Sequence, residues 1–206
     1  MKIPAPVRAL LATAAMQCCV CAQERISIAV FNYAGAPHSV LAPAVETARM
    51  AYRAAGIETV WTICDPENWA PPFSVADRYL DLLVMPRLVG RMPGGAAQAH
   101  PAGYAMPDGP FLRPRAYAFY DAVKRGADRT VRPISLVLGC VMIHETAHLL
   151  GLHHQSHGVM RANLETEDMD NVATGRAFNA EEGQRLRTRA SLARASLALA
   201  GKPTHP

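Results

Sequence analysis

Residues 144–154 read HETAHLLGLHH, and the run directly before them, ISLVLGCVMI, carries no charge. The apolar residues predict a helix over 134–150 that is buried on nearly all sides. Because residues i and i+4 lie on one face of a helix, His144 and His148 can bind the same metal ion. Glu145 follows His144 directly, so it lies beside the ion and can take a proton from a metal-bound water.

A third ligand can reach the ion only if the helix ends soon after these residues. Gly151 can adopt a positive φ angle, which would end the helix and turn the chain back. His154 then supplies a third nitrogen ligand, and the spacing favours it over two nearby alternatives, His153 and His157. Three histidines leave a fourth coordination position for water, which is the arrangement of a catalytic zinc site rather than a structural one.

The pattern HExxHxxGxxH resembles the extended motif of the metzincin clan of zinc metallopeptidases, which it matches at five residues: His144, Glu145, His148, Gly151 and His154. Within the clan it is most similar to the matrixin style, and it also resembles small bacterial secreted metzincin-like proteins. The resemblance implies Zn2+ as cofactor and an endopeptidase acting on protein or peptide substrates, with Glu145 as general base and later acid. It also implies a Met-turn below the metal, which Met160 is placed to supply.

Hydrophobic periodicity predicts the strands and helices around this motif. Alternating and β-branched residues predict four strands, at residues 25–33, 57–64, 80–89 and 116–123. Helices are predicted at 40–55, at 134–150 and from a cap at Asn179 to about Leu199, and 90–115 is predicted as a long irregular segment. With the resemblance, this order predicts an α+β, zincin-like fold. It would contain a twisted mixed sheet of about four strands, two long helices, the active-site helix, the Met-turn and a C-terminal helix.

The first residues of the chain have the features of a secretory signal peptide. Lys2 and Arg8 form a basic start, an apolar run follows, and small residues precede a cut after Ala22. Residues 1–22 are therefore predicted to be removed, which leaves 23–206 as a single catalytic domain that is secreted or periplasmic. The first strand begins almost at the cut, so we expect no inhibitory pro-segment. No later stretch is long enough to form an integral membrane span.

Two cysteines, Cys64 and Cys140, remain after this cleavage. In an oxidising compartment they could form one disulfide, while two buried thiols, one in a strand and one in a helix, agree equally well with the sequence. Spacing does not decide between these alternatives, because it says nothing about the distance between the two Cα atoms.

Charge and composition exclude one class of partner and leave two other functions open. The net charge of +4 comes without a block of Lys or Arg, which argues against nucleic-acid binding, and no oligomeric state is indicated. One alternative is a zinc-binding extracellular or envelope interaction protein with little peptidase activity. Another is binding of anionic envelope material through arginines of the last helix: Arg185, Arg187, Arg189 and Arg194. For a peptidase, an extended peptide could pair with residues 116–120 if that strand is a sheet edge.

Overall fold

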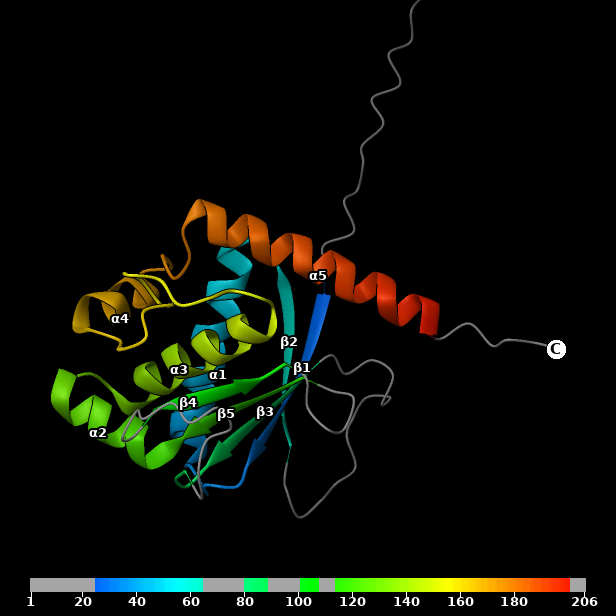
Figure 1. Cartoon of the computed structure of the whole chain (residues 1–206). Coiled ribbons are helices and arrows are strands. Elements are labelled where there is room, and N and C mark those ends of the chain that lie inside the picture. The colour runs from blue at the N-terminus through cyan, green and yellow to red at the C-terminus, as the bar shows by residue number, and fades with distance from the viewer. Residues whose placement is uncertain (1–24, 65–79, 89–100, 108–113, 201–206) are drawn as a thin grey trace, which may run out of the picture.

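A mixed sheet of five strands forms the centre of the fold (Figure 1). The computed structural model describes residues 25–64, 80–88, 101–107 and 114–200. The strands are β1 (Arg25–Asn32), β2 (Glu58–Cys64), β3 (Leu80–Met85), β4 (Gly103–Met106) and β5 (Arg115–Phe119). The helices are α1 (His38–Ala54), α2 (Tyr120–Thr130), α3 (Ile134–Leu149), α4 (Thr166–Ala173) and α5 (Ala180–Ala200).

The strand order is β2-β1-β3-β5-β4, so β4 lies at one edge of the sheet. The other four strands are parallel to one another, and β4 pairs antiparallel with β5. In this register Val30 pairs with Leu82, and Leu82 pairs with Ala116. Because alternate side chains of a strand point to opposite faces, these buried residues share one face of the sheet, and they belong to the main core that it forms with α1 and α3.

The helix α1 is the platform on which α3 rests. The two helices approach closely at Gly139, where an added Cβ would lie 2.9 Å from Thr47 Cβ and 3.0 Å from the carbonyl oxygen of Ala44. Polar contacts also cross this interface, because the hydroxyl of fully buried Tyr52 lies 2.7 Å from Thr146 Oγ1 and 3.3 Å from the carbonyl oxygen of Ile143. The packing therefore fixes α3, which contains the first part of the motif, against the sheet.

The sheet has five strands where the sequence predicts about four. The additional strand, β4, lies inside the segment 90–115 that is predicted to be irregular. Its four residues are too few to show a period of two, and all four are half-buried, so they give no alternation of apolar and polar residues. The part of that segment at 89–100 and 108–113 lies outside the described residues.

The predicted strand 116–123 is also corrected, because β5 ends at Phe119 and α2 begins at the next residue. The alternation seen in the sequence holds for the strand, but Val123 and Ala127 are four residues apart and are the buried residues of α2. The strand is also not an edge, since β4 covers it on its outer side. A substrate peptide therefore cannot pair with 116–120 as expected.

The three predicted helices agree with the structure, whereas α2 and α4 are helices that the sequence does not predict. The sequence predicts α1, α3 and α5, and the reciprocal hydrogen bonds at the start of α5 join Asn179 and Glu182, at 2.8 and 2.9 Å. The eight-residue helix α4 was missed. None of the helices in the described part of the chain combines the length and apolar character needed to cross a bilayer. The predicted signal peptide, 1–22, lies outside the described residues.

The two cysteines do not form a disulfide with each other. Cys140 is a buried free thiol in the core between α3 and the sheet, and burial raises its pKa to about 12. Cys64 packs on the opposite face of the sheet, with Ala29 and Phe31. Of the two alternatives left open by the sequence, the disulfide between Cys64 and Cys140 is therefore wrong.

Candidate metal centre

The end of α3 turns the chain back in the way that Gly151 predicts. Gly151 has a φ angle of 85°, a region of backbone conformation that favours glycine. Its N–H donates to the carbonyl of His148 at 2.9 Å, and the N–H of Leu152 donates to that of Ala147 at 3.0 Å. These two bonds form a Schellman motif, which satisfies the last carbonyls of the helix and reverses the chain.

The reversal gives His148 a backbone partner. The carbonyl of Leu152 lies 2.7 Å from His148 Nδ1, and the carbonyl of Val159 lies 2.7 Å from Nδ1 of His144. A carbonyl oxygen only accepts hydrogen bonds, so both Nδ1 atoms must carry the proton. In a neutral imidazole this leaves the Nε2 lone pair of each ring available to bind a metal ion.

These Nε2 atoms converge with that of His154. His144 Nε2 lies 3.0 Å from His148 Nε2 and 3.2 Å from His154 Nε2. Two nitrogens bound to one tetrahedral zinc ion lie about 3.3 Å apart, given zinc–nitrogen bonds of about 2.0–2.1 Å. Within the described residues these three histidines form the group of side chains that could hold one metal ion. The donor set therefore fits Zn2+.

The structure distinguishes among the three histidines that the sequence left as candidates for the third ligand. His154 joins His144 and His148, whereas the exposed His153 and His157 are outside that group. His157 instead lies 3.1 Å from the hydroxyl of Ser156 through Nδ1. The three clustered residues differ in exposure: His144 is buried, His148 is intermediate and His154 is exposed. Solvent and substrate would reach the site from the side of His154.

Glu145 is buried, with 7% of its surface exposed. In the described part of the chain no group donates a hydrogen bond to its carboxylate. Burial of this unpaired group raises its pKa to about 8. Burial has the opposite effect on the histidines, because it lowers the pKa of His144 to about 4 and also lowers that of His148. A lowered pKa favours the neutral form of His144 and His148 at pH 7, which is the form that binds metal.

A turn after the last histidine supports His144. Gln155 N–H donates to the carbonyl of Met160 at 2.9 Å, and Arg161 N–H donates to that of Gly158 at 3.0 Å. This turn presents the Val159 carbonyl to His144. Met160, the residue predicted for the Met-turn, is fully buried in the turn, and its place below a metal ion stays a prediction.

One buried residue that holds this turn is not indicated by any sequence pattern. Asp168 on α4 is 2% exposed, and its carboxylate accepts hydrogen bonds from Gly158 N–H at 2.8 Å and from Glu165 N–H at 3.0 Å. The guanidinium of Arg161 lies 3.0 Å from the same carboxylate. An aspartate at this distance from the motif belongs to no pattern, so its contact with the turn was visible only in three dimensions.

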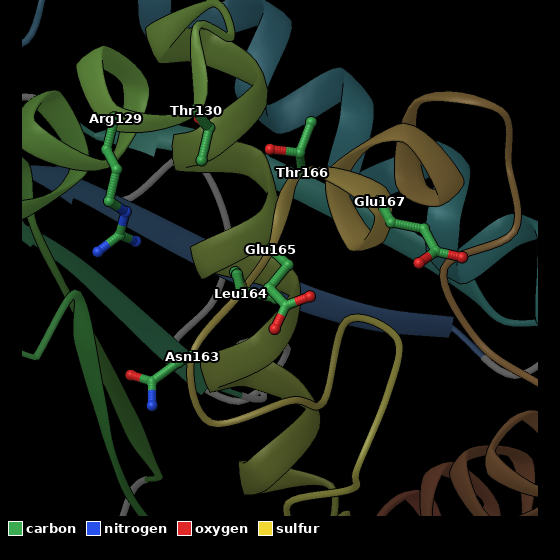
Figure 2. A pocket seen from close by; sticks show the side chains of 7 residues that line it. All are labelled: Arg129, Thr130, Asn163, Leu164, Glu165, Thr166 and Glu167. Carbon is green, nitrogen blue, oxygen red and sulfur yellow. The ribbon is translucent and has the colours of Figure 1, made fainter.

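A shallow pocket of about 460 Å³ lies apart from this cluster. Figure 2 shows that side chains at the end of α2 and around the start of α4 line it: Arg129, Thr130, Asn163, Leu164, Glu165, Thr166 and Glu167. None of these is a residue of the histidine cluster. The carboxylate of Glu165 is already paired with Arg161 at 2.6 Å, so the pocket gives no second candidate for the chemistry.

Comparison with known proteins gives similarity at the level of structure. No family model matches the chain. No curated protein matches it either. A zinc-dependent peptidase from Methanocorpusculum labreanum (strain Z) has a similar structure, with a TM-score of 0.53 and 15% identity over 77% of this chain and 99% of that one. Archaemetzincin from Methanopyrus kandleri is also similar, with a TM-score of 0.57 and 13% identity over 82% of this chain and 97% of that one. At these identities the likeness is one of fold: the chain has a mixed α/β fold that zinc peptidases also have.

Proposed function

We propose that this chain is an exported zinc-dependent endopeptidase of the metzincin type. The observation that carries the proposal is the convergence of three Nε2 atoms, together with the buried carboxylate of Glu145, the residue after His144, which has no hydrogen-bonding partner in the described residues. The similarity to a zinc-dependent peptidase and to an archaemetzincin supports both the choice of zinc and the choice of peptide substrates. Neither of these two proteins is a matrixin by name, so they give no support to the matrixin style in particular.

His144, His148 and His154 would hold the ion through Nε2, and a bound zinc ion would polarise the scissile carbonyl and acidify a water molecule. Glu145 accepts one proton from that water as its oxygen attacks the carbonyl carbon. The same carboxylic acid then gives the proton to the nitrogen of the leaving amine, and the C–N bond breaks. One water is consumed for each peptide bond cleaved, and because both of its protons end on the leaving amine, the products at neutral pH are a carboxylate and a protonated amine.

The buried position of Glu145 suits it to both proton transfers. A pKa of about 8 in the metal-free fold means that the group holds a proton readily near neutral pH. A cation bound by the neighbouring histidines favours the charged carboxylate and lowers that pKa again. Glu145 can therefore act as a base when the ion is bound and still return its proton to a leaving amine, whose own affinity for protons is high.

The edge strand β4 is the candidate site for binding an extended peptide. The antiparallel pairing of β4 with β5 leaves the outer side of β4 unpaired with any described strand. The helix α3 contacts β4, so a peptide added to this edge would run close to Glu145. Export of the protein depends on the signal peptide predicted at 1–22.

Metal analysis and cleavage profiling of the purified protein test this proposal together. We expect one equivalent of zinc at neutral pH and cleavage within a broad peptide library. Glu145→Ala should keep the metal and lower kcat/KM by about 10²–10⁴-fold, which is the usual contribution of a general base. His154→Ala should lose both metal and activity, and the matched variant His153→Ala, at an exposed neighbour, should keep both. Absence of stoichiometric zinc would contradict the central claim.

The same experiment separates the proposed enzyme from the two alternatives. A zinc-binding interaction protein would retain the metal, and Glu145→Ala would change nothing in the cleavage assay. Binding through the basic last helix has less support, because two of its arginines have partners inside the protein. Arg187 donates to the carbonyl of Ala55 at 2.6 Å, and Arg185 pairs with Glu181 at 2.6 Å.

A further inference from the structure

Gly103 is the first residue of the edge strand β4, and the backbone around it is held in place. It pairs with Ala118 of β5, and the carbonyl of Ala102 accepts a hydrogen bond from Phe119 N–H at 2.8 Å. Ala118 is fully buried in the main core. The start of β4 therefore cannot move outward without breaking its pairing with β5.

The backbone conformation of Gly103 does not itself require glycine. The described glycines with a positive φ angle are at five other positions, among them Gly151 in the metal centre. At Gly103 any residue could adopt the same backbone angles. The reason for a glycine at this position must therefore lie in the space around it.

That space is filled by Glu145. A Cβ added to Gly103 would lie 2.5 Å from both Cγ and Oε1 of Glu145, and 2.7 Å from Cδ. Such distances are well inside van der Waals contact. Rotation of the carboxylate alone would not relieve the overlap, because the position of Cγ is set by χ1, the first torsion of the side chain. Any side chain at position 103 would force Glu145 into another rotamer or push β4 away.

The helix α3, which carries Glu145, cannot move to relieve this overlap. It contacts both α1 and β4, and Thr146, the next residue, is fully buried against Tyr52. The bare backbone of β4 is thus one wall of the space that Glu145 occupies.

We propose that Gly103 is a positioning residue for Glu145: its missing side chain lets the carboxyl group lie against the edge strand and so permits the rotamer that Glu145 adopts directly after His144. The role of Glu145 as general base rests on the proposed function, whereas the steric coupling of the two positions does not. A displacement of about 1 Å at a reacting group can lower a rate by about 10²-fold. Gly103 would therefore set the rate of the chemical step without touching the substrate or the ion through a side chain.

A double-mutant cycle between positions 103 and 145 tests the coupling without any activity measurement. In the metal-free protein, Gly103→Ala should lower Tm by about 5 °C, as expected for overpacking in a domain of this size. In the Glu145→Ala background, where the space is vacant, the same substitution should lower Tm by less than half as much. Gly126→Ala on α2 is the matched control, since its Cβ would meet only Val137 Cγ1 at 3.4 Å and should give equal shifts in both backgrounds.

Kinetics of the zinc-loaded protein test the positioning role itself. Gly103→Ala should retain stoichiometric zinc, lower kcat by about 10²-fold and change KM much less. If Gly103→Ala alone does not fold but the double variant with Glu145→Ala does, the coupling is supported. Equal loss of Tm in both backgrounds, failure of both to fold, or an unchanged kcat would overturn the proposal. If the protein cleaves no peptide at all, the proposed function fails, and the Tm cycle still decides whether position 103 constrains Glu145.

Discussion

The burial of Glu145 lowers the stability of the metal-free fold whenever its carboxyl group is charged. Glu145 is 7% exposed, and its carboxyl group has no hydrogen-bond donor among the described residues. Burial raises its pKa from 4.5 to about 8, so between these values the folded state binds more protons than the unfolded state. The contribution of Glu145 to the free energy of unfolding is therefore most favourable below pH 4.5 and decreases as the pH rises toward 8.

This linkage predicts that Glu145→Gln stabilises the metal-free protein at high pH. The neutral amide avoids the cost of burying a charge, so the variant should exceed the wild type by roughly 2–4 kcal/mol in free energy of unfolding at pH 8. The difference should be small at pH 4.5, where Glu145 is protonated in the folded state and about half protonated in the unfolded state. Urea unfolding in the presence of a chelator, at both pH values, measures it. A difference that does not grow with pH would show that the carboxylate is not buried as described.

At the scale of elements, the sequence was most informative where a pattern is long or chemically specific. The helix α3 has an uninterrupted apolar run, and its histidine spacing identifies two candidate ligands on one face. The strand β4 has four residues, all half-buried, and the helix α4 is eight residues long, so neither is long enough to show a clear period in the sequence. Gly103 and Asp168 were missed for another reason. Each acts through a contact with a distant segment, and no local pattern records such contacts.

Asp168 on α4 should therefore affect the affinity for zinc, although it lies outside the histidine motif in the sequence. Its carboxylate accepts from Gly158 N–H and Glu165 N–H, and this holds the turn whose Val159 carbonyl orients His144. Because partners behind a ligand typically contribute 10–100-fold in metal affinity, Asp168→Asn should weaken zinc binding by about that factor. Competition with a chromophoric chelator measures the affinity.

Asp170→Asn is the matched control on the same helix. Asp170 pairs with Arg132 at 2.8 Å, and its side chain is 52% exposed, so its loss should change stability little and leave zinc affinity unchanged. Equal loss of zinc by both variants would mean that α4 as a whole, rather than the Asp168 carboxylate, supports the site.

In the domain as a whole, the candidate centre joins the packed core to an exposed segment of the chain. His144 and His148 lie on α3, which packs against α1 and the sheet, whereas His154 lies in an exposed segment beyond the end of that helix. In the metal-free fold that segment is attached to the rest through the Schellman motif and the turn at 158–161. A metal ion would add a third connection, because one of its ligands comes from the exposed segment and two come from the core.

Zinc should consequently stabilise the entire domain and not only the loop. An ion that binds the folded state alone adds about 2.7 kcal/mol at 100 times its Kd, which for a domain of this size raises Tm by about 5–10 °C. Thermal unfolding with increasing zinc should show a Tm that rises with the logarithm of the free ion concentration, and a chelator should reverse the rise. His154→Ala should abolish the shift, while His157→Ala, at an exposed residue outside the cluster, should preserve it. An equal shift with Mg2+, which prefers oxygen ligands, would contradict a three-nitrogen site, because the ion would then be bound elsewhere.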